Sequence, residues 1–169
     1  MLFRSERAQE VGGTWRDNHY PGCACDVESH LYSFSFEPNP NWSRMYAPQP
    51  EIFAYLRHVA RKYDLMRHIR FGANLVGARW DDARQIWVVT AEDGRIFEGQ
   101  FLVSGMGGLS NPAIPDIRGL DTFEGTTFHS ATWNHDFDLN DKRVAVIGSG
   151  ASAIQFVPQI APKVAQLSY

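Results

Sequence analysis

The chain has 169 residues, of which 44% are hydrophobic and 21% charged, and its net charge is −3. This composition is ordinary for a globular protein and excludes a strongly basic, nucleic-acid-binding surface. Two cysteines, Cys23 and Cys25, are too few for a disulfide framework. No apolar run approaches the roughly 18 residues of a membrane span. We therefore expect a cytoplasmic protein with no nucleic acid, no membrane and no recognisable protein partner.

The first part of the chain predicts a strand end, a long loop and a helix. Residues 1–7 resemble the end of a strand that closes on acidic Glu6. The stretch 12–48 is rich in Gly, Pro, Asn and Asp, and loops of that length are usually functional. From Pro50 to Tyr63 apolar residues recur at helical spacing. Basic residues on and after this helix are interspersed with acidic ones, which favours a solvated face: Arg57, Arg61, Lys62, Arg67 and Arg70.

Strand signals follow the helix. They predict strands at 69–75, 86–90 and 96–103, with a turn at Asp93-Gly94 between the last two. Residues 109–140 are punctuated by Pro and Gly and are expected to form a linker. A β-branched strand at 143–147 then leads into a helix that Pro158 should kink or end. Residues 164–169 resemble the start of another strand.

A glycine turn separates the strand at 143–147 from that helix. Its pattern is G-x-G-x-x-A, from Gly148 through Gly150 to Ala153. Gly148 permits the turn, Gly150 lets the backbone approach a pyrophosphate, and the small Ala153 lets helix and strand pack closely. A ribose or 2′-phosphate ligand is expected about 20 residues further on, so local residues do not distinguish NADPH from NADH.

The linker contains a pattern of four fixed residues, which we call the fingerprint: Phe123-x-Gly125-x-x-x-His129-x-x-x-Trp133. Placed just before a second glycine turn, it resembles the signature of Baeyer–Villiger monooxygenases, with Asn134 as a departure. Further segments resemble this family along most of the chain: 12–15, 25–29, 49–52 and 105–115. Ala24 stands where the family often has Arg, which puts a nicotinamide-side contact there in doubt.

The resemblance implies a fold and a division into domains. The fold is α/β, a Rossmann-type flavoprotein fold with two dinucleotide-binding sites, truncated at both ends. Residues 1–140 would form an FAD-binding domain that lacks its first βα unit and ends in the linker 109–140. Residues 141–169 would begin an NADPH-binding domain.

The resemblance also implies roles for individual residues. Glu6 would bind the adenosine ribose of FAD, and Leu75 would meet the adenine through its backbone. Asp26, the candidate catalytic residue, would lie with Tyr32 near the isoalloxazine. The remaining FAD contacts would follow the pyrophosphate and ribityl chain: Gly12, Gly13, Thr14 and Trp15. The NADPH contacts would come from the second turn and its helix: Gly148, Ser149, Gly150, Ala151, Ser152, Ala153 and Gln155.

The implied activity uses FAD, NADPH and O2 to insert oxygen next to the carbonyl of a small-molecule ketone, giving an ester or lactone. The linker would act as the moving joint between the domains, so His129 and Trp133 would affect coupling more than binding. Alternatives are a flavin-containing N- or S-oxygenating monooxygenase, which Trp133 disfavours, a flavoprotein reductase, and an inactive fragment. We expect an internal piece of a longer protein that alone holds no FAD tightly.

A metal site is a further alternative in the loop. His19, Cys23, Cys25 and His30 offer nitrogen and sulfur ligands. Their spacing is not a usual zinc pattern, so no metal is expected.

Overall fold

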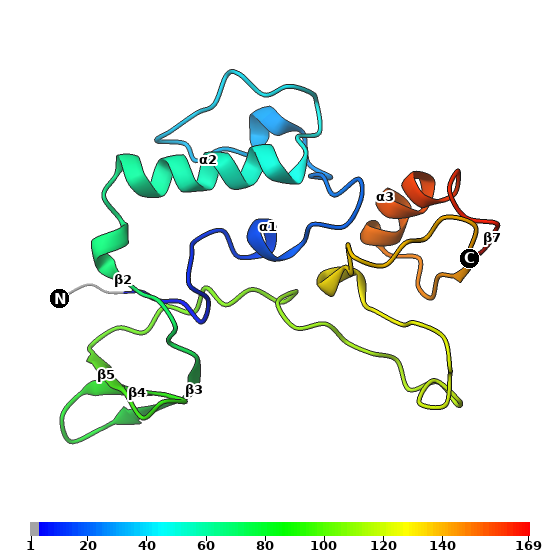
Figure 1. The fold of residues 1–169 in the computed structure, drawn as a ribbon. Coiled ribbons are helices and arrows are strands. Elements are labelled where there is room, and N and C mark those ends of the chain that lie inside the picture. The colour runs from blue at the N-terminus through cyan, green and yellow to red at the C-terminus, as the bar shows by residue number, and fades with distance from the viewer. Residues whose placement is uncertain (1–3) are drawn as a thin grey trace. The chain divides into compact units, whose positions relative to one another are not determined.

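The computed structural model describes residues 4–169. The chain forms two compact units. Unit 1 contains the residues up to Gly12 together with Leu56–Gly108, and unit 2 contains Gly13–Tyr55 together with Leu109–Tyr169. Helix α2, Gln49–Lys62, begins in unit 2 and ends in unit 1 (Figure 1).

Unit 1 holds two small sheets. In the first sheet, β1, Arg4–Ser5, pairs in parallel with β2, Ile69–Arg70. The 3-10 helix η2, Met66–His68, directly precedes β2. The second sheet is antiparallel and three-stranded, in the order β3, Leu75–Asp81, β4, Ile86–Ala91, and β5, Ile96–Gly99. Val88, Val89 and Ala91 of the central strand are buried, so β4 provides most of the apolar packing of this sheet.

The strand predictions for unit 1 are partly correct. The strand end predicted at 1–7 is present as β1, and residues 1–3 of that prediction lie outside the described part of the chain. The stretch predicted at 69–75 is interrupted, because Gly72 adopts a positive φ of 61° and Leu75 begins a separate strand. The strand predicted at 96–103 ends at Gly99. Phe101 and Val103 are each 89% exposed, and no described strand pairs with them. A short apolar run alone does not form a strand without a partner edge.

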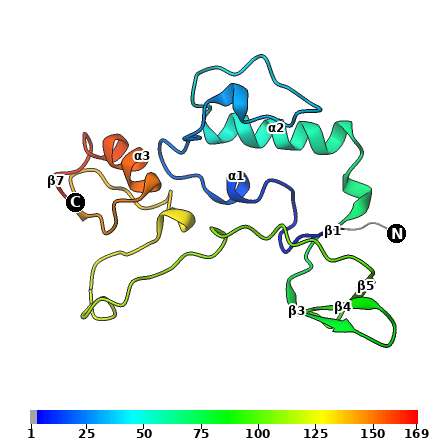
Figure 2. The same cartoon turned by 180° about the vertical axis from the view of Figure 1, so that it is seen from behind.

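Unit 2 contains the remaining elements. Its helices are α1, Thr14–Asp17, and α3, Ala151–Ile160, with 3-10 turns η1, Ser29–Leu31, and η3, Ser130–Thr132. Its strands are β6, Arg143–Ala145, and β7, Gln166–Ser168, which pair in parallel through the α3 crossover. Both ribbon views show β7 beside α3 (Figures 1 and 2). This is a βαβ unit, the building block of parallel α/β sheets.

The helix α3 forms where the sequence predicts it. It buries Ala153, Phe156 and Ile160, which lie on one face at spacings of three and four residues. Pro158 lies inside the helix, which ends two residues later at Ile160. The strands at its two sides are shorter than predicted, 143–145 and 166–168.

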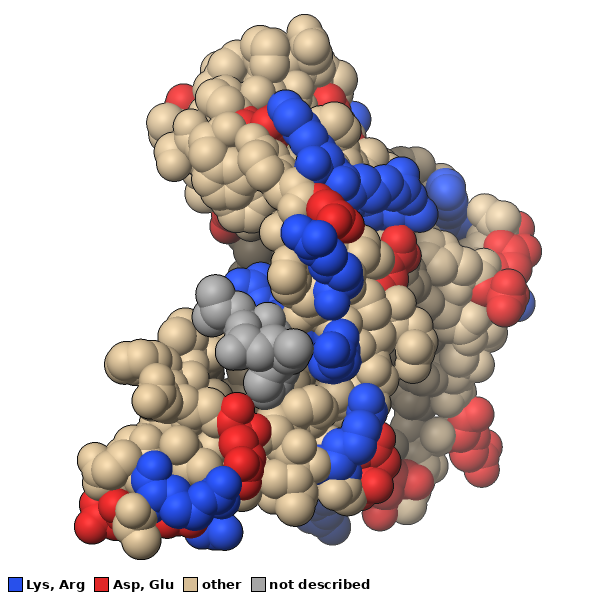
Figure 3. Space-filling model, turned by 90° about the vertical axis from the view of Figure 1, so that its left-hand side faces the viewer, with Lys and Arg blue, Asp and Glu red and all other residues tan. Residues whose placement is uncertain are grey.

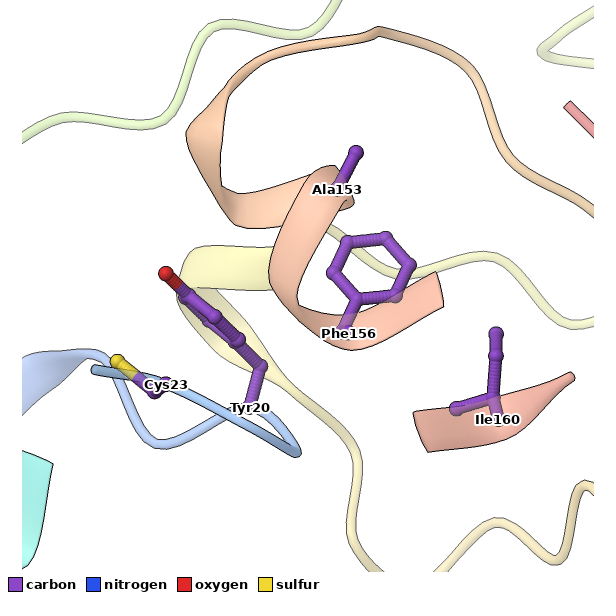
Figure 4. Close-up of a cluster of buried hydrophobic side chains, with 5 residues drawn as sticks. All are labelled: Tyr20, Cys23, Ala153, Phe156 and Ile160. Carbon is purple, nitrogen blue, oxygen red and sulfur yellow. The ribbon is translucent and has the colours of Figure 1, made fainter. Parts of the chain in front are cut away.

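The core of unit 2 combines α3 with the loop that follows α1. Tyr20 and Cys23 of that loop are buried against the three buried residues of α3 (Figure 4). Partly buried residues pack around this cluster: Trp15, Trp133, Leu139, Val144, Val146, Val157 and Leu167. The loop after α1 is therefore part of a hydrophobic core.

The basic cluster behaves as a solvated face. Arg57 pairs with Glu10 at 2.8 Å and Arg67 with Asp64 at 3.2 Å, and these side chains are largely exposed. Figure 3 shows acidic side chains among the basic ones on this side of the molecule. Exposed pairs of this kind contribute little stability. Within residues 4–169, no helix combines the length and hydropathy needed to cross a bilayer.

Candidate cofactor-binding site

The turn before α3 has the geometry of an anion-binding turn. Gly148 has φ 108°, a value that side-chain-bearing residues rarely adopt. Gly150 is the N-cap residue of α3, with φ −72° and ψ 175°, and no side chain caps the helix in the described chain. A Cβ added at either glycine would meet nothing within 4 Å. The space beside both glycines is thus open, as the close approach of a pyrophosphate to the backbone requires.

Ala153 explains how this turn is supported. It is 5% exposed and belongs to the cluster against which Val144 and Val146 pack. A larger side chain would push α3 away from β6. The sequence-based reason for a small residue at this position agrees with the packing.

The turn before α1 also contains glycines with positive φ, but it leads into a shorter helix. Gly12 has φ 118° and Gly13 has φ 49°. Gly13 is the N-cap residue of α1, which has four residues and buries none. Within unit 2, Trp15 Nε1 donates a hydrogen bond of 2.9 Å to the hydroxyl of Tyr32, and the two rings meet edge to face. The residues predicted beside the flavin, Trp15 and Tyr32, are therefore in contact.

Glu6 and Leu75 lie in unit 1. Glu6 directly follows β1, and its Oε1 accepts a hydrogen bond from Ala8 N at 3.0 Å. Leu75 begins β3, opposite Ala91, next to a register shift. Glu6 therefore stands at a strand end, the position expected of an acidic residue that binds a ribose. Its predicted ribose contact and the predicted backbone contact of Leu75 with the adenine stay predictions.

Asp26 is exposed. It lies two residues after Ala24, the last residue of a loop, Tyr20–Ala24, that is hydrogen-bonded to α3. The side chain of Gln155 binds this loop: Oε1 accepts from Tyr20 Oη at 2.9 Å and from Ala24 N at 3.3 Å. Nε2 of Gln155 donates to Ala24 O at 2.8 Å. The amide of Gln155, predicted to contact a cofactor, is thus used within the protein.

Burial keeps the phenol and the thiols of this loop protonated. Desolvation raises the pKa of Tyr20 to about 12, with smaller opposing and reinforcing effects of Ser152, Cys23 and Asp26. Burial also raises the pKa of the Cys23 and Cys25 thiols. Tyr20 therefore remains a hydrogen-bond donor, and the thiols are poor nucleophiles and metal ligands at neutral pH.

Phe123 and His129 of the fingerprint make contacts within the linker, whereas Trp133 contacts α3. A Cβ on Gly125 would lie 2.4 Å from the Phe123 ring, so this ring requires glycine two residues on. His129 is the N-cap residue of η3, and its Nδ1 accepts from Ala131 N at 3.1 Å. Trp133 packs against Phe156 with ring centroids 5.1 Å apart. The fingerprint therefore fixes the conformation of the linker and joins it to α3.

The four candidate metal ligands do not come together. Across residues 4–169, no three His, Cys, Asp or Glu side chains are arranged to hold a metal ion. His19 instead contacts His135, with Nδ1 and Nε2 2.8 Å apart. Cys23 and Cys25 are buried as free thiols.

Several residues that organise the loop were not recognised from the sequence. Gly22 has φ 78°, and its Cβ would lie 2.7 Å from the Gln155 carbonyl oxygen. The dipeptide Pro21-Gly22 is a turn signal that marks this position. The contacts of Tyr20 with α3 and of His19 with His135 leave no local sequence signal, since the partners lie far apart in the chain.

Comparison with known proteins gives a consistent result over nearly the whole chain. The flavin-binding monooxygenase-like family matches residues 4–168. A Baeyer–Villiger monooxygenase of Pseudomonas aeruginosa is 54% identical over 162 residues, and one of Streptomyces coelicolor is 55% identical over 163. Each alignment covers 96% of this chain and 31% of the relative. The chain thus spans about a third of the length of these curated relatives.

Solved structures give the same picture. A cyclohexanone monooxygenase with bound epsilon-caprolactone superimposes with a TM-score of 0.89 at 40% identity, covering 98% of this chain and 33% of the other. A steroid monooxygenase bound to NADP gives a TM-score of 0.87 at 47% identity, with the same coverage. The predicted resemblance to Baeyer–Villiger monooxygenases and the flavoprotein α/β fold are confirmed. The chain belongs to the flavin-binding monooxygenase-like family.

Proposed function

We propose that this chain supplies parts of the FAD and NADPH sites of a Baeyer–Villiger monooxygenase, which inserts one oxygen atom of O2 next to a ketone carbonyl. The carrying observation is the fingerprint directly before a βαβ unit whose glycine turn is open and uncapped. The relatives at 54% and 55% identity, both Baeyer–Villiger monooxygenases, support this assignment.

The chain is divided at residue 140 into an FAD-binding part and an NADPH-binding part. Residues 1–140 contribute to the FAD site and end in the linker 109–140, and residues 141–169 contribute to the NADPH site. In support, β6 and β7 form a separate two-stranded sheet in the described part of the chain. The compact units run differently, since unit 2 also includes Gly13–Tyr55. A flavin-side loop is therefore packed with the NADPH-side helix.

The second turn is assigned to the NADPH pyrophosphate. Its backbone N–H groups and the dipole of α3 would hold the phosphates from Gly148 to Ala153, with Gly150 leaving space for their approach. Ser149 and Ser152 would add hydroxyl donors. Each charge-assisted hydrogen bond of this type contributes on the order of 1.5–3 kcal/mol.

The FAD contacts are assigned to Glu6 and to residues of the loop 12–48. Glu6 would bind the adenosine ribose, and Gly12 to Trp15 would follow the pyrophosphate and ribityl chain. Tyr32, held by Trp15, would lie at the ring system. When bound, the flavin supplies the electron transfer from NADPH to O2 and the oxygenation of the ketone.

Asp26 is the residue that we assign to the reacting end of the site. Its side chain is exposed. The Asp26 carboxylate is therefore available to pair with an arginine of the active site. The fingerprint would couple the linker to the dinucleotide helix through the contact of Trp133 with Phe156.

The test is isotope incorporation by the natural protein. Supplied with FAD, NADPH, ¹⁸O2 and cyclic or linear ketones, it should yield an ester or lactone with one ¹⁸O atom, detected by mass spectrometry. Oxides of amines or sulfides without any ester would favour the N- or S-oxygenating alternative. NADPH consumption that releases only hydrogen peroxide with every ketone would contradict the proposal.

A further inference from the structure

Gln155 makes an unusual set of contacts for a residue next to a dinucleotide turn. Its amide pairs with both backbone groups of Ala24, accepting from N at 3.3 Å and donating to O at 2.8 Å. The same oxygen accepts the hydroxyl of Tyr20 at 2.9 Å. The side chain thus binds the backbone of the loop as a strand edge would, and Ala24 lies 131 residues away in the sequence.

The loop approaches α3 too closely for this contact to be incidental. A Cβ on Gly22 would lie 2.7 Å from the carbonyl oxygen of Gln155 and 2.8 Å from Cγ of Gln159. Tyr20 and Cys23, on either side of Gly22, belong to the buried cluster that includes Phe156 (Figure 4). The Tyr20–Ala24 loop therefore lies directly on the surface of α3.

The opposite edge of the loop is held independently. Cys25 N donates to Ala47 O at 2.9 Å, and Gln49 N donates to Cys23 O at 2.8 Å. Ala24 also forms an isolated antiparallel bridge with Pro48. Gln155 thus forms the hydrogen bonds between α3 and the backbone of Ala24, and residues 47–49 form those on the other edge of the loop.

We propose that Gln155 is a positioning residue that fixes the Tyr20–Asp26 segment to the dinucleotide-binding helix. Asp26 lies two residues after Ala24, and two extended residues span at most about 7 Å. Holding the backbone of Ala24 therefore restricts Asp26 relative to the turn that begins α3. This inference rests on the proposed function for the roles of Asp26 and of the turn, but the attachment itself can be tested without them.

The test uses the two thiols of the loop. Cys23 belongs to the buried cluster that includes Phe156 and Ile160 of α3, whereas Cys25 is buried outside that cluster. In the natural protein, Gln155→Met keeps length and helix propensity but removes all three hydrogen bonds. Labelling by a dithiodipyridine, read at each cysteine by mass spectrometry, should become about tenfold faster at Cys23, because lost hydrogen bonds favour local opening. Labelling of Cys25 should remain within about twofold of wild type.

Gln159→Met is the matched control, since it makes the same change one turn along the same helix and should leave both rates unchanged. Unaltered labelling of Cys23 in Gln155→Met would overturn the proposal. If both cysteines in that variant become reactive as its melting temperature falls, Gln155→Glu decides the question.

The carboxyl group that Gln155→Glu introduces can again donate to Ala24 O when it is protonated, whereas the ionised carboxylate is repelled by that oxygen. The Cys23 labelling rate of Gln155→Glu relative to wild type should therefore fall from about pH 8 to about pH 4, as the carboxyl group is protonated. A ratio independent of pH would overturn the proposal. Neither result depends on ketone oxygenation, so failure of the proposed function is recorded separately, in the isotope experiment.

Discussion

The two glycine turns of this chain have similar backbones but different support. Gly12 and Gly148 both adopt strongly positive φ, 118° and 108°, and each turn leads into a helix without a side-chain cap. The helix after the first turn, α1, has four residues and buries none. The helix after the second, α3, has ten and buries three.

This difference shows how a hydrophobic core can hold the backbone of a glycine turn in place. Positive φ directs the backbone N–H groups outward, but a hydrophobic core must hold the helix that carries them. The aligned peptide dipoles of α3 extend over ten residues, and its buried face fixes their direction. The second turn is therefore preorganised by its own unit, while the first relies on neighbouring loop contacts such as that of Trp15 with Tyr32.

The largest expected effect is loss of the core that supports the second turn. Phe156 is 8% exposed and contacts the rings of Tyr20 and Trp133. Phe156→Ala should lower the free energy of unfolding by about 3–5 kcal/mol. The matched change in the first helix, Thr14→Ala at an exposed position, should stay within about 0.5 kcal/mol. Denaturant titrations of both variants measure this, and equal losses would refute the difference in support.

A smaller effect is expected from strain at the turns themselves. An alanine at Gly148 must adopt φ 108° or displace the start of α3, at a cost of about 1–3 kcal/mol. Gly13→Ala introduces similar strain, at φ 49°, but α1 has no buried residue and only its partly buried Trp15 packs against the core, so its loss should stay below about 1 kcal/mol. Thermal melts of the two variants compare them. A larger loss at Gly13 would mean that the first turn is the better anchored one.

The smallest effect concerns the tie between the loop and α3. Tyr20→Phe removes the hydrogen bond to Gln155 and should cost about 0.5–1.5 kcal/mol at pH 7. Burial raises the pKa of Tyr20 to about 12 in the folded protein, above the ordinary value of about 10. The stability linked to this shift is complete below about pH 10 and is lost as pH rises toward 12. Alkaline unfolding of Tyr20→Phe should therefore show a weaker pH dependence above about pH 10 than wild type; parallel curves would contradict this.

The sequence predicted the second turn well because every signal there is local. The β-branched strand, the glycines and the apolar face of α3 lie within one continuous stretch, 143–160. The long loop was predicted to be functional, which stays a prediction, and was not predicted to be part of a core, since Tyr20 meets Gln155 across 135 residues. The apolar run at 101–103 predicted a strand end that lacks a partner edge among the described residues. Pairing and docking depend on distant residues, which local patterns do not report.

We proposed that the second turn binds a dinucleotide pyrophosphate. A substitution at Gly150 tests this proposal most directly, because the φ of −72° at Gly150 suits any residue and an added Cβ meets no atom within 4 Å. A valine there should leave folding nearly intact while its methyl groups occupy the space next to the first-turn N–H groups. Isothermal titration of the natural protein and of Gly150→Val with NADP⁺ should give a dissociation constant about 100-fold weaker for the variant, with little change in melting temperature. Equal affinities for NADP⁺ would show that the turn does not bind the pyrophosphate.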